Sequence, residues 1–286
     1  MDINKEKIEQ IISKFEKEKG ELKISPDLLV KFNTSNREHV ACLSYLNGTG
    51  GYYMLFLKYL IEKLDIKNTV ELGNQTGMST VAIYDATRND NTKKLYTIDI
   101  ERDQRFCPDE MYISKNVSFI FGDVCSDKVI KQLPRNIDLL FTDTLHYDFQ
   151  LQDEYELYQH LLADTALVAI DDIRSNDKGK LFDSLDFDKW DLTELCHVSG
   201  WGLFLYKRKT PISGEEREKL ITLAIHNIWE KKVSRLQKEL DIKNKTYWRA
   251  VKNLLKKLTP LYKIYTRTYN IIHKTFFKKT VRFYER

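Results

Sequence analysis

Three acidic side chains stand directly after two predicted buried strands of this 286-residue chain. Asp143 closes the apolar run 137–143, and Asp171 with Asp172 follows the run 166–170. Ligands of a doubly wound α/β sheet bind beyond the carboxyl ends of its strands, so these carboxylates should converge there. Clustered anions repel one another unless a cation lies among them, and a hard ion such as Mg²⁺ suits an all-oxygen site. We therefore expect a divalent cation at the three acids; otherwise they cap helices or face solvent.

His146 follows Asp143 by three residues and is a candidate proton acceptor. A neutral imidazole, with an ordinary pKa of about 6.5, suits proton abstraction at neutral pH. The alternative is a structural role in which His146 bonds the loop that follows it. Asp143 and His146 are thus the candidate catalytic residues. The other histidines before residue 242 share no spacing and are interpreted as structural: His39, His160, His197 and His226.

A glycine-punctuated turn joins a predicted strand at 69–72 to a predicted helix at about 77–88. Gly73 and Gly77 carry no Cβ, so the backbone can turn sharply and approach a ligand. Such a turn should point its N–H groups and a helix N-terminus at that ligand; the alternative is a tight turn that binds nothing. The dinucleotide pattern GxGxxG and the Gly-Lys-Ser/Thr of a P-loop are both absent. Asp99 ends the next predicted strand, 26 residues after Gly73.

The acidic-x-Gly-x-x-x-Gly pattern at 71–77 resembles the first motif of class I S-adenosylmethionine-dependent methyltransferases. The resemblance implies that Asp99 accepts hydrogen bonds from the ribose hydroxyls of that cofactor. It also implies that Asp123, after the predicted strand 117–121, contacts the adenine; otherwise Asp123 is a loop or helix-cap residue. The candidate cofactor-binding residues are Asn47, Glu71, Gly73, Asn74, Gly77, Ser79, Asp99 and Asp123.

The three acids at the strand ends resemble the metal ligands of metal-dependent O-methyltransferases of the catechol and sugar-modifying types. The pair after the fifth strand, here the run 166–170, is often Asp-Asn in the catechol type, so Asp171-Asp172 is closer to the sugar-modifying type. The catechol type has a lysine base at the place of His146. The sugar-modifying type has Asp-Gly-Asp-His, and its second Asp, a proposed base, is Leu145 here, which makes His146 the leading candidate.

The resemblance implies methyl transfer to a hydroxyl of a sugar or glycan, helped by a divalent cation, with a vicinal diol as the expected chelating acceptor. Coordination lowers the pKa of a hydroxyl and fixes its oxygen for attack on the sulfonium methyl. One alternative is a soluble catechol-like O-methyltransferase that acts on small molecules. Another is a methyltransferase-fold scaffold whose tail recruits a membrane, RNA or a protein partner.

Five strand–helix units closed by a hairpin, Trp190–Val198 with Gly202–Tyr206, resemble the class I methyltransferase sheet, in which the last strand is antiparallel. The expected fold is α/β: a Rossmann-like, doubly wound sheet of seven mostly parallel strands. Near-continuous apolar runs are typical of strands that helices cover on both faces. We expect a helical cover at 1–65, the core at 66–209 and a helical, basic tail at 210–286. In the cover, Ser25 before Pro26 predicts a capped short helix.

With 286 residues, 42% of them hydrophobic and 31% charged, the chain suffices for one large domain with appendages. The four cysteines have no paired spacing and are expected to be reduced thiols of a cytoplasmic protein. The first 20 residues carry no apolar run of secretory-signal length, and no run approaches the ~18 apolar residues of a membrane span.

The last part of the tail, residues 242–286, holds 13 Lys and Arg and one acid, whereas the rest of the chain has 33 basic and 41 acidic residues. Apolar residues recur at intervals of three and four in two stripes, 229–240 and 248–276, which favours a homo-oligomer through helices at 229–276. Basic residues beside aromatic ones equally suit an anionic membrane surface, at the inner membrane face. Nucleic acid is disfavoured because no binding motif is present. Pro260 should break this helix near Leu258.

Overall fold

The computed structural model describes residues 3–32 and 35–257. The chain forms two compact units, residues 1–228 and 229–286. One long helix, α10 (Gly214–Lys257), contributes residues to both. The predicted segment boundaries after residues 65 and 209 stay predictions.

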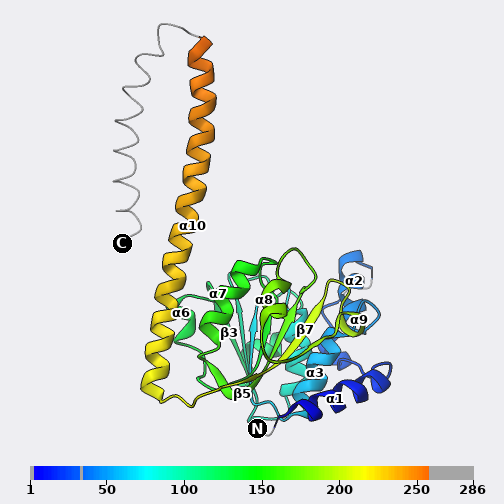
Figure 1. Ribbon diagram of the computed structural model, residues 1–286. Coiled ribbons are helices and arrows are strands. Elements are labelled where there is room, and N and C mark those ends of the chain that lie inside the picture. Colours follow the sequence, from blue (N-terminus) through cyan, green and yellow to red (C-terminus); the bar gives the residue numbers. More distant parts are fainter. Residues whose placement is uncertain (1–2, 33–34, 258–286) are drawn as a thin grey trace. The chain divides into compact units, whose positions relative to one another are not determined.

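Seven strands form one sheet in the order β3-β2-β1-β4-β5-β7-β6 (Figure 1). Strands β1 to β5 pair in parallel, and β7 runs antiparallel to both β5 and β6. The prediction of a Rossmann-like, mostly parallel sheet closed by an antiparallel hairpin is confirmed. The order reverses between β1 and β4, so a ligand crevice is expected outside their carboxyl ends. The strands are β1 (Asn68–Leu72), β2 (Lys94–Asp99), β3 (Val117–Phe121), β4 (Ile137–Thr142), β5 (Leu162–Asp171), β6 (Asp188–Asp191) and β7 (Trp201–Lys207).

Helices cover both faces of the sheet. Successive residues of a strand point to opposite faces, so one strand contributes side chains to two cores. Leu139 and Phe141 pack into the core that α1 to α4 cover, whereas Leu140 packs into the core that α6 to α8 cover. The early helices are α1 (Lys5–Glu18), η1 (Pro26–Leu29), α2 (Arg37–Leu46), α3 (Tyr53–Lys63) and α4 (Met78–Thr87). The later ones are α5 (Asp109–Ile113), α6 (Asp127–Ile130), α7 (Asp148–Tyr158), α8 (Gly179–Ser184) and α9 (Thr193–Cys196).

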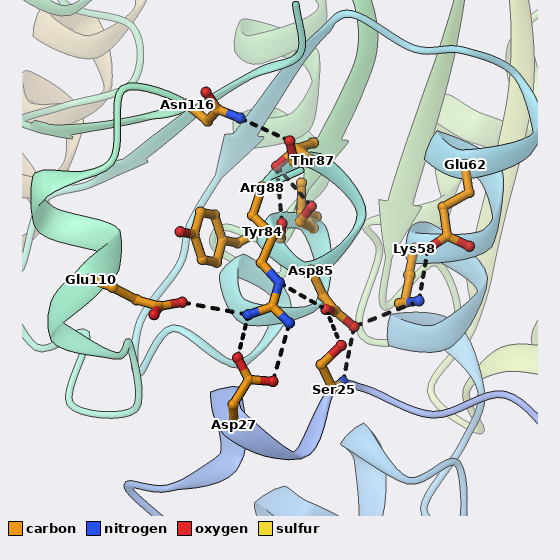
Figure 2. Close-up of polar contacts among 11 residues, drawn as sticks. Ser25, Asp27, Lys58, Glu62, Tyr84, Asp85, Thr87, Arg88, Glu110 and Asn116 are labelled. Atoms are coloured by element: carbon orange, nitrogen blue, oxygen red, sulfur yellow. Dashed lines mark hydrogen bonds and ion pairs between the residues drawn. The ribbon is translucent and has the colours of Figure 1, made fainter. Parts of the chain in front are cut away.

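A polar network ties the N-terminal segment to α3 and α4 (Figure 2). Asp85 of α4, whose side chain is buried, accepts hydrogen bonds from the N–H of Ser25 at 3.0 Å and from its hydroxyl at 2.6 Å. Lys58 of α3 places its Nζ 3.6 Å from the same carboxylate. Arg88 meets Asp27 of η1 through two guanidinium nitrogens. Ser25 is the N-cap residue of η1 and Pro26 is in its first turn, as predicted, but the Ser25 side chain bonds Asp85 and not the backbone of η1.

The predicted strand Trp190–Val198 is also wrong in extent. Strand β6 ends at Asp191, and the helix α9 follows it. The Asp191 carboxylate accepts hydrogen bonds from both the N–H and the hydroxyl of Thr193. Such local side-chain bonds compete with a strand ladder and favour a helix start, which the apolar pattern alone does not reveal.

Helix α10 begins in the first unit, where Ile221, Ala224 and Ile228 are buried. In the second unit, four apolar side chains at the predicted spacing are exposed: Trp229, Val233, Leu236 and Leu240. Among the residues that the structure describes, no helix has the length and apolar character to cross a membrane. The expected break at Pro260 and the tail beyond residue 257 lie outside the described residues.

Candidate cofactor and metal site

The two glycines of the turn after β1 have backbone conformations that suit only residues without a Cβ. Gly73 has a φ of +82°, and a Cβ there would lie 2.2 Å from the carbonyl oxygen of Asp143. Gly77 has a φ of +90°, and a Cβ there would lie 2.4 Å from the Sγ of Cys107. Both values fall in the left-handed region that glycine tolerates. The turn therefore packs directly against the end of β4.

Asp99, at the end of β2, binds the glycine turn through its carboxylate. Its Oδ2 accepts hydrogen bonds from the N–H groups of Asn74 at 2.9 Å and Gln75 at 2.8 Å. Its Oδ1 accepts from the N–H of Glu101 at 2.9 Å. The expectation that the turn points its N–H groups at a ligand is thus wrong for Asn74 and Gln75. Asp99 itself stands at the carboxyl edge of the sheet, where the ribose-binding prediction needs it.

Hydrogen bonds among buried polar side chains hold the glycine turn in place. Glu71 is fully buried, and its Oε2 accepts hydrogen bonds from the hydroxyls of Thr80 and Thr97 at 2.7 and 2.6 Å. Burial raises the pKa of this carboxyl, and hydrogen bonding from Ser79 opposes the shift. Asn74 donates to the Thr97 hydroxyl at 2.7 Å. The side chains of Glu71, Asn74 and Ser79 hence hold one another in place, and their contribution to cofactor binding stays a prediction.

Two further cofactor candidates lie in local turns. Asp123 follows β3, and its Oδ1 accepts a hydrogen bond from the N–H of Cys125 at 2.9 Å, the loop role that the sequence left open. Asn47 follows α2 and is exposed, with its N–H bonded to the Leu43 carbonyl oxygen at 2.9 Å. The part of Asp123 and Asn47 in cofactor binding stays a prediction.

The three predicted metal ligands lie at the carboxyl ends of two neighbouring strands, in two groups with the spacing of metal ligands: Asp143 and Asp172 with His146, and Asp171 and Asp172 with His197. Thr142 of β4 pairs with Ile170 of β5, so Asp143 and Asp171 follow at the same level. Asp171 and Asp172 are 3% and 8% exposed. Burial and the nearby Asp171 carboxylate raise the pKa of Asp143. This mutual repulsion is what a bound cation would relieve, and the oxygen donors suit a divalent ion.

His146 lies against this acid cluster. Its Nε2 is 2.9 Å from Asp172 Oδ2 and 3.9 Å from Asp143 Oδ1. The side chain is 44% exposed, so an acceptor molecule can reach it. Asp172 has a φ of +61°, a strained conformation that an aspartate adopts more readily than most residues. The turn after β5 thereby brings the Asp172 carboxylate to the imidazole.

His197, which the sequence analysis interprets as structural, also lies at the acids. Its Nδ1 is 3.3 Å from Asp171 Oδ1 and 3.8 Å from Asp172 Oδ1. The hydrogen bond with Asp171 raises the pKa of His197, and burial opposes this shift without outweighing it. The position of His197 follows from the sheet register. Trp201 of β7 pairs with Asp171 of β5, which brings the loop before Trp201 to the acids.

A family model described as a methyltransferase domain matches residues 70–173, from β1 to just beyond β5. Residues 70–173 are a methyltransferase domain, and the sheet that they belong to has the class I topology. The predicted methyltransferase family and fold are thereby confirmed. Comparison with curated proteins gives no match.

Several solved structures resemble the methyltransferase domain and its surroundings. The SAH-bound methyltransferase PaMTH1 of Podospora anserina is 18% identical, with a TM-score of 0.48 over 73% of this chain and 98% of its own. The O-methyltransferase TomG of Streptomyces achromogenes, in complex with SAM, is 19% identical, with a TM-score of 0.42 over 54% and 79%. A methyltransferase of Geobacter sulfurreducens is 20% identical, with a TM-score of 0.43 over 54% and 77%.

A buried carboxyl of the methyltransferase domain holds the backbone on both sides of Asp143. Glu154 of α7 accepts hydrogen bonds from the hydroxyls of Thr142 at 2.7 Å and Thr144 at 2.6 Å. Burial raises the pKa of Glu154, and these hydrogen bonds together with the charge of Lys178 oppose that shift. Lys178 is fully buried, and its Nζ has no hydrogen-bond partner among the described residues. Glu154 and Lys178 are residues that the sequence analysis did not single out.

Proposed function

We propose that the chain transfers the methyl group of S-adenosylmethionine to a hydroxyl oxygen of a sugar or glycan, with the help of a divalent cation. The observation that carries the proposal is the meeting of Asp143, Asp171 and Asp172 with His146 beside the glycine turn. The methyl donor and the acceptor would then meet at one edge of the sheet, above the ends of β1, β4 and β5.

Cofactor binding is assigned to the turn after β1 and to Asp99. A carboxylate has more acceptor positions than the three backbone N–H groups on Asp99 fill, so it can still accept a ribose hydroxyl. The backbone bonds fix the orientation of Asp99 before the cofactor arrives. Hydrogen bonds to a charged group are among the stronger ones, which suits a residue that selects the ribose.

Asp143, Asp171 and Asp172 would hold the divalent cation. When bound, the cation supplies a lowered pKa for the acceptor hydroxyl and a fixed position for its oxygen. Glu154 keeps Asp143 in place, because it bonds the residues on either side of it. Two neighbouring oxygens on the acceptor chelate better than one, which supports a vicinal diol as the acceptor group.

His146 is proposed as the residue that takes the proton of the acceptor hydroxyl. If Nε2–H donates to Asp172 Oδ2, the lone pair of the neutral ring lies on Nδ1, and that atom is the proton acceptor. The Asp172 carboxylate would stabilise the imidazolium that forms. The competing role, in which His146 only bonds Asp172, leaves activation of the hydroxyl to the cation.

The test is methyl transfer from labelled S-adenosylmethionine to matched acceptors, with and without a chelator. Glycosides with a vicinal cis-diol and their single-deoxy analogues form one series, and catechols form the other. Turnover of the diols that vanishes in chelator and returns with a divalent ion supports the proposal. Turnover of catechols alone favours the catechol-like enzyme. Cofactor binding without turnover across the panel favours the scaffold, and full activity in excess chelator excludes the metal role.

A further inference from the structure

His197 faces two of the three predicted metal ligands with one ring nitrogen. Its Nδ1 lies 3.3 Å from Asp171 Oδ1 and 3.8 Å from Asp172 Oδ1. The other oxygen of Asp172 faces His146 at 2.9 Å. The donor atoms of Asp171, Asp172 and His197 all lie within 4.8 Å of one another. One nitrogen and two carboxylate oxygens therefore converge on one small volume.

These separations match those between ligands of one metal ion. Octahedral ions hold their ligands at about 2.1 Å, so neighbouring donor atoms stand about 3.0 Å apart and opposite ones about 4.2 Å apart. Both distances from His197 Nδ1 fall between those limits. The side chains of Asp171, Asp172 and His197 are 4%, 11% and 12% exposed, so little bulk water competes at these atoms.

The His197 ring is held in place from the N-terminal segment. Its centroid lies 5.6 Å from that of Tyr45, which belongs to α2, and 5.0 Å from that of Tyr53, which belongs to α3. The preceding residue, Cys196, accepts a hydrogen bond on its carbonyl oxygen from the N–H of Tyr52 at 2.7 Å. Preorganisation of this kind is what a metal ligand needs, since its ring orientation is set before the ion binds.

We infer that His197 is a nitrogen ligand of the metal site, together with Asp171 and Asp172, and that the site therefore selects a first-row transition ion over Mg²⁺. Imidazole nitrogen suits transition ions, whereas Mg²⁺ prefers oxygen ligands and retains its waters. A site built from the carboxylate oxygens alone is expected to bind Mg²⁺, and the nitrogen of His197 changes that expectation. This inference rests on the metal-assisted function proposed above.

The experiment measures metal affinity and not turnover. Dissociation constants for Ni²⁺, Co²⁺ and Mg²⁺ are determined by calorimetry on the metal-free full chain. The wild-type protein should bind Ni²⁺ and Co²⁺ at least about tenfold more tightly than Mg²⁺. Equal affinities, or tighter binding of Mg²⁺, would overturn the inference without any variant. If none of the three ions binds, the metal-assisted function itself fails, which is a different result from a lack of selectivity.

Two variants separate a ligand from a hydrogen-bonding neighbour. His197→Asn keeps an N–H donor near the place of Nδ1, and His197→Ala keeps none. A ligand role predicts that both lower the Ni²⁺-to-Mg²⁺ affinity ratio by about tenfold or more and change the visible absorption of bound Co²⁺. His160→Gln, outside the acid cluster, should keep the wild-type ratio. An unchanged ratio in His197→Asn, with unchanged S-adenosylmethionine binding as the check on folding, shows that His197 only positions Asp171.

Discussion

Gly73 packs against the backbone of Asp143, so the glycine turn is in direct contact with the loop that carries one of the proposed metal ligands. A Cβ at Gly73 would stand 2.2 Å from the Asp143 carbonyl oxygen, and the φ of Gly73 is +82°. Because that oxygen is backbone, it cannot rotate away as a flexible side chain would. A change in the turn must therefore displace the start of the loop that carries Asp143 and His146.

Replacement of Gly73 by alanine tests this contact. Strain at a left-handed position costs roughly 1–3 kcal/mol, and the collision adds to it. We expect Gly73→Ala to lower the free energy of unfolding and to weaken both S-adenosylmethionine and metal binding, measured by denaturant titration and calorimetry. Gly20→Ala is the matched control, since a Cβ at Gly20 has nothing within 4 Å. Loss of cofactor affinity alone would show that the turn moves without Asp143.

Asp99 should determine cofactor affinity. Loss of a charge-assisted hydrogen bond costs about 1.5–3 kcal/mol, so Asp99→Ala should weaken S-adenosylmethionine binding about tenfold or more. Because Asp99 also bonds the N–H groups of Asn74 and Gln75, Asp99→Asn is the informative companion: its amide oxygen can still accept from the turn. Calorimetry is the measurement, with Asp103→Asn on the surface as the control. Unchanged affinity in both Asp99 variants would remove the ribose assignment.

His146 should matter for rate and not for cofactor affinity. General-base catalysis contributes about 10²–10⁴ in rate, so His146→Ala should lower turnover by that range at pH 7. The defect should shrink as pH rises, because more of the acceptor is then already ionised. Initial rates across a pH series measure this. Near wild-type turnover at pH 7 would assign His146 a structural role beside Asp172 and leave activation to the cation.

Most of the strand positions could be predicted from the sequence. Runs such as 137–142 and 166–170 are strongly apolar because helices cover both sheet faces, and the structure places strands there. The acids after β4 and β5 could be placed together for the same reason, since parallel neighbours end at one edge. These predictions depend on local pattern and on one topological rule.

Features that depend on long-range register could not be predicted. His197 reaches Asp171 because Trp201 of β7 pairs with Asp171 of β5. The resemblance predicts the antiparallel strand, but no spacing in the sequence encodes this register. The hydrogen bonds from Asn74 and Gln75 to Asp99 likewise join segments 25 and 24 residues apart. Helix α9 begins where the Asp191 carboxylate accepts a hydrogen bond from the N–H of Thr193, although the neighbouring residues have the apolar pattern of a strand.

His160 gives a pH-dependent contribution to stability. Burial and the nearby Arg208 and Arg217 lower its pKa below the ordinary value of 6.5. The folded protein therefore favours the neutral ring, so this contribution is present above about pH 6.5 and is lost as pH falls through the folded pKa. We expect the free energy of unfolding to fall less between pH 7.5 and pH 5.5 in His160→Gln than in the wild type. Identical pH slopes in urea titrations would show that His160 does not titrate with unfolding.

The basic tail should act independently of the methyltransferase chemistry. Every candidate for cofactor or metal binding lies before residue 198, whereas 13 Lys and Arg with a single acid lie in residues 242–286. Each basic residue near an anionic surface contributes about 1 kcal/mol, and salt screens that attraction. The full chain should therefore bind vesicles that contain anionic lipid at low salt, release them as salt rises and bind neutral vesicles poorly.

A chain that ends at Asp241 is the matched variant for this test. It keeps Ile221, Ala224 and Ile228, which are buried in the first unit, and removes the basic residues. We expect it to lose vesicle flotation yet keep S-adenosylmethionine binding and transfer to a soluble acceptor. Loss of cofactor binding would instead make the tail part of the folded core. A full chain that ignores vesicles but sediments as a salt-resistant oligomer would favour assembly through the stripe at 229–276, whose first four apolar side chains are exposed.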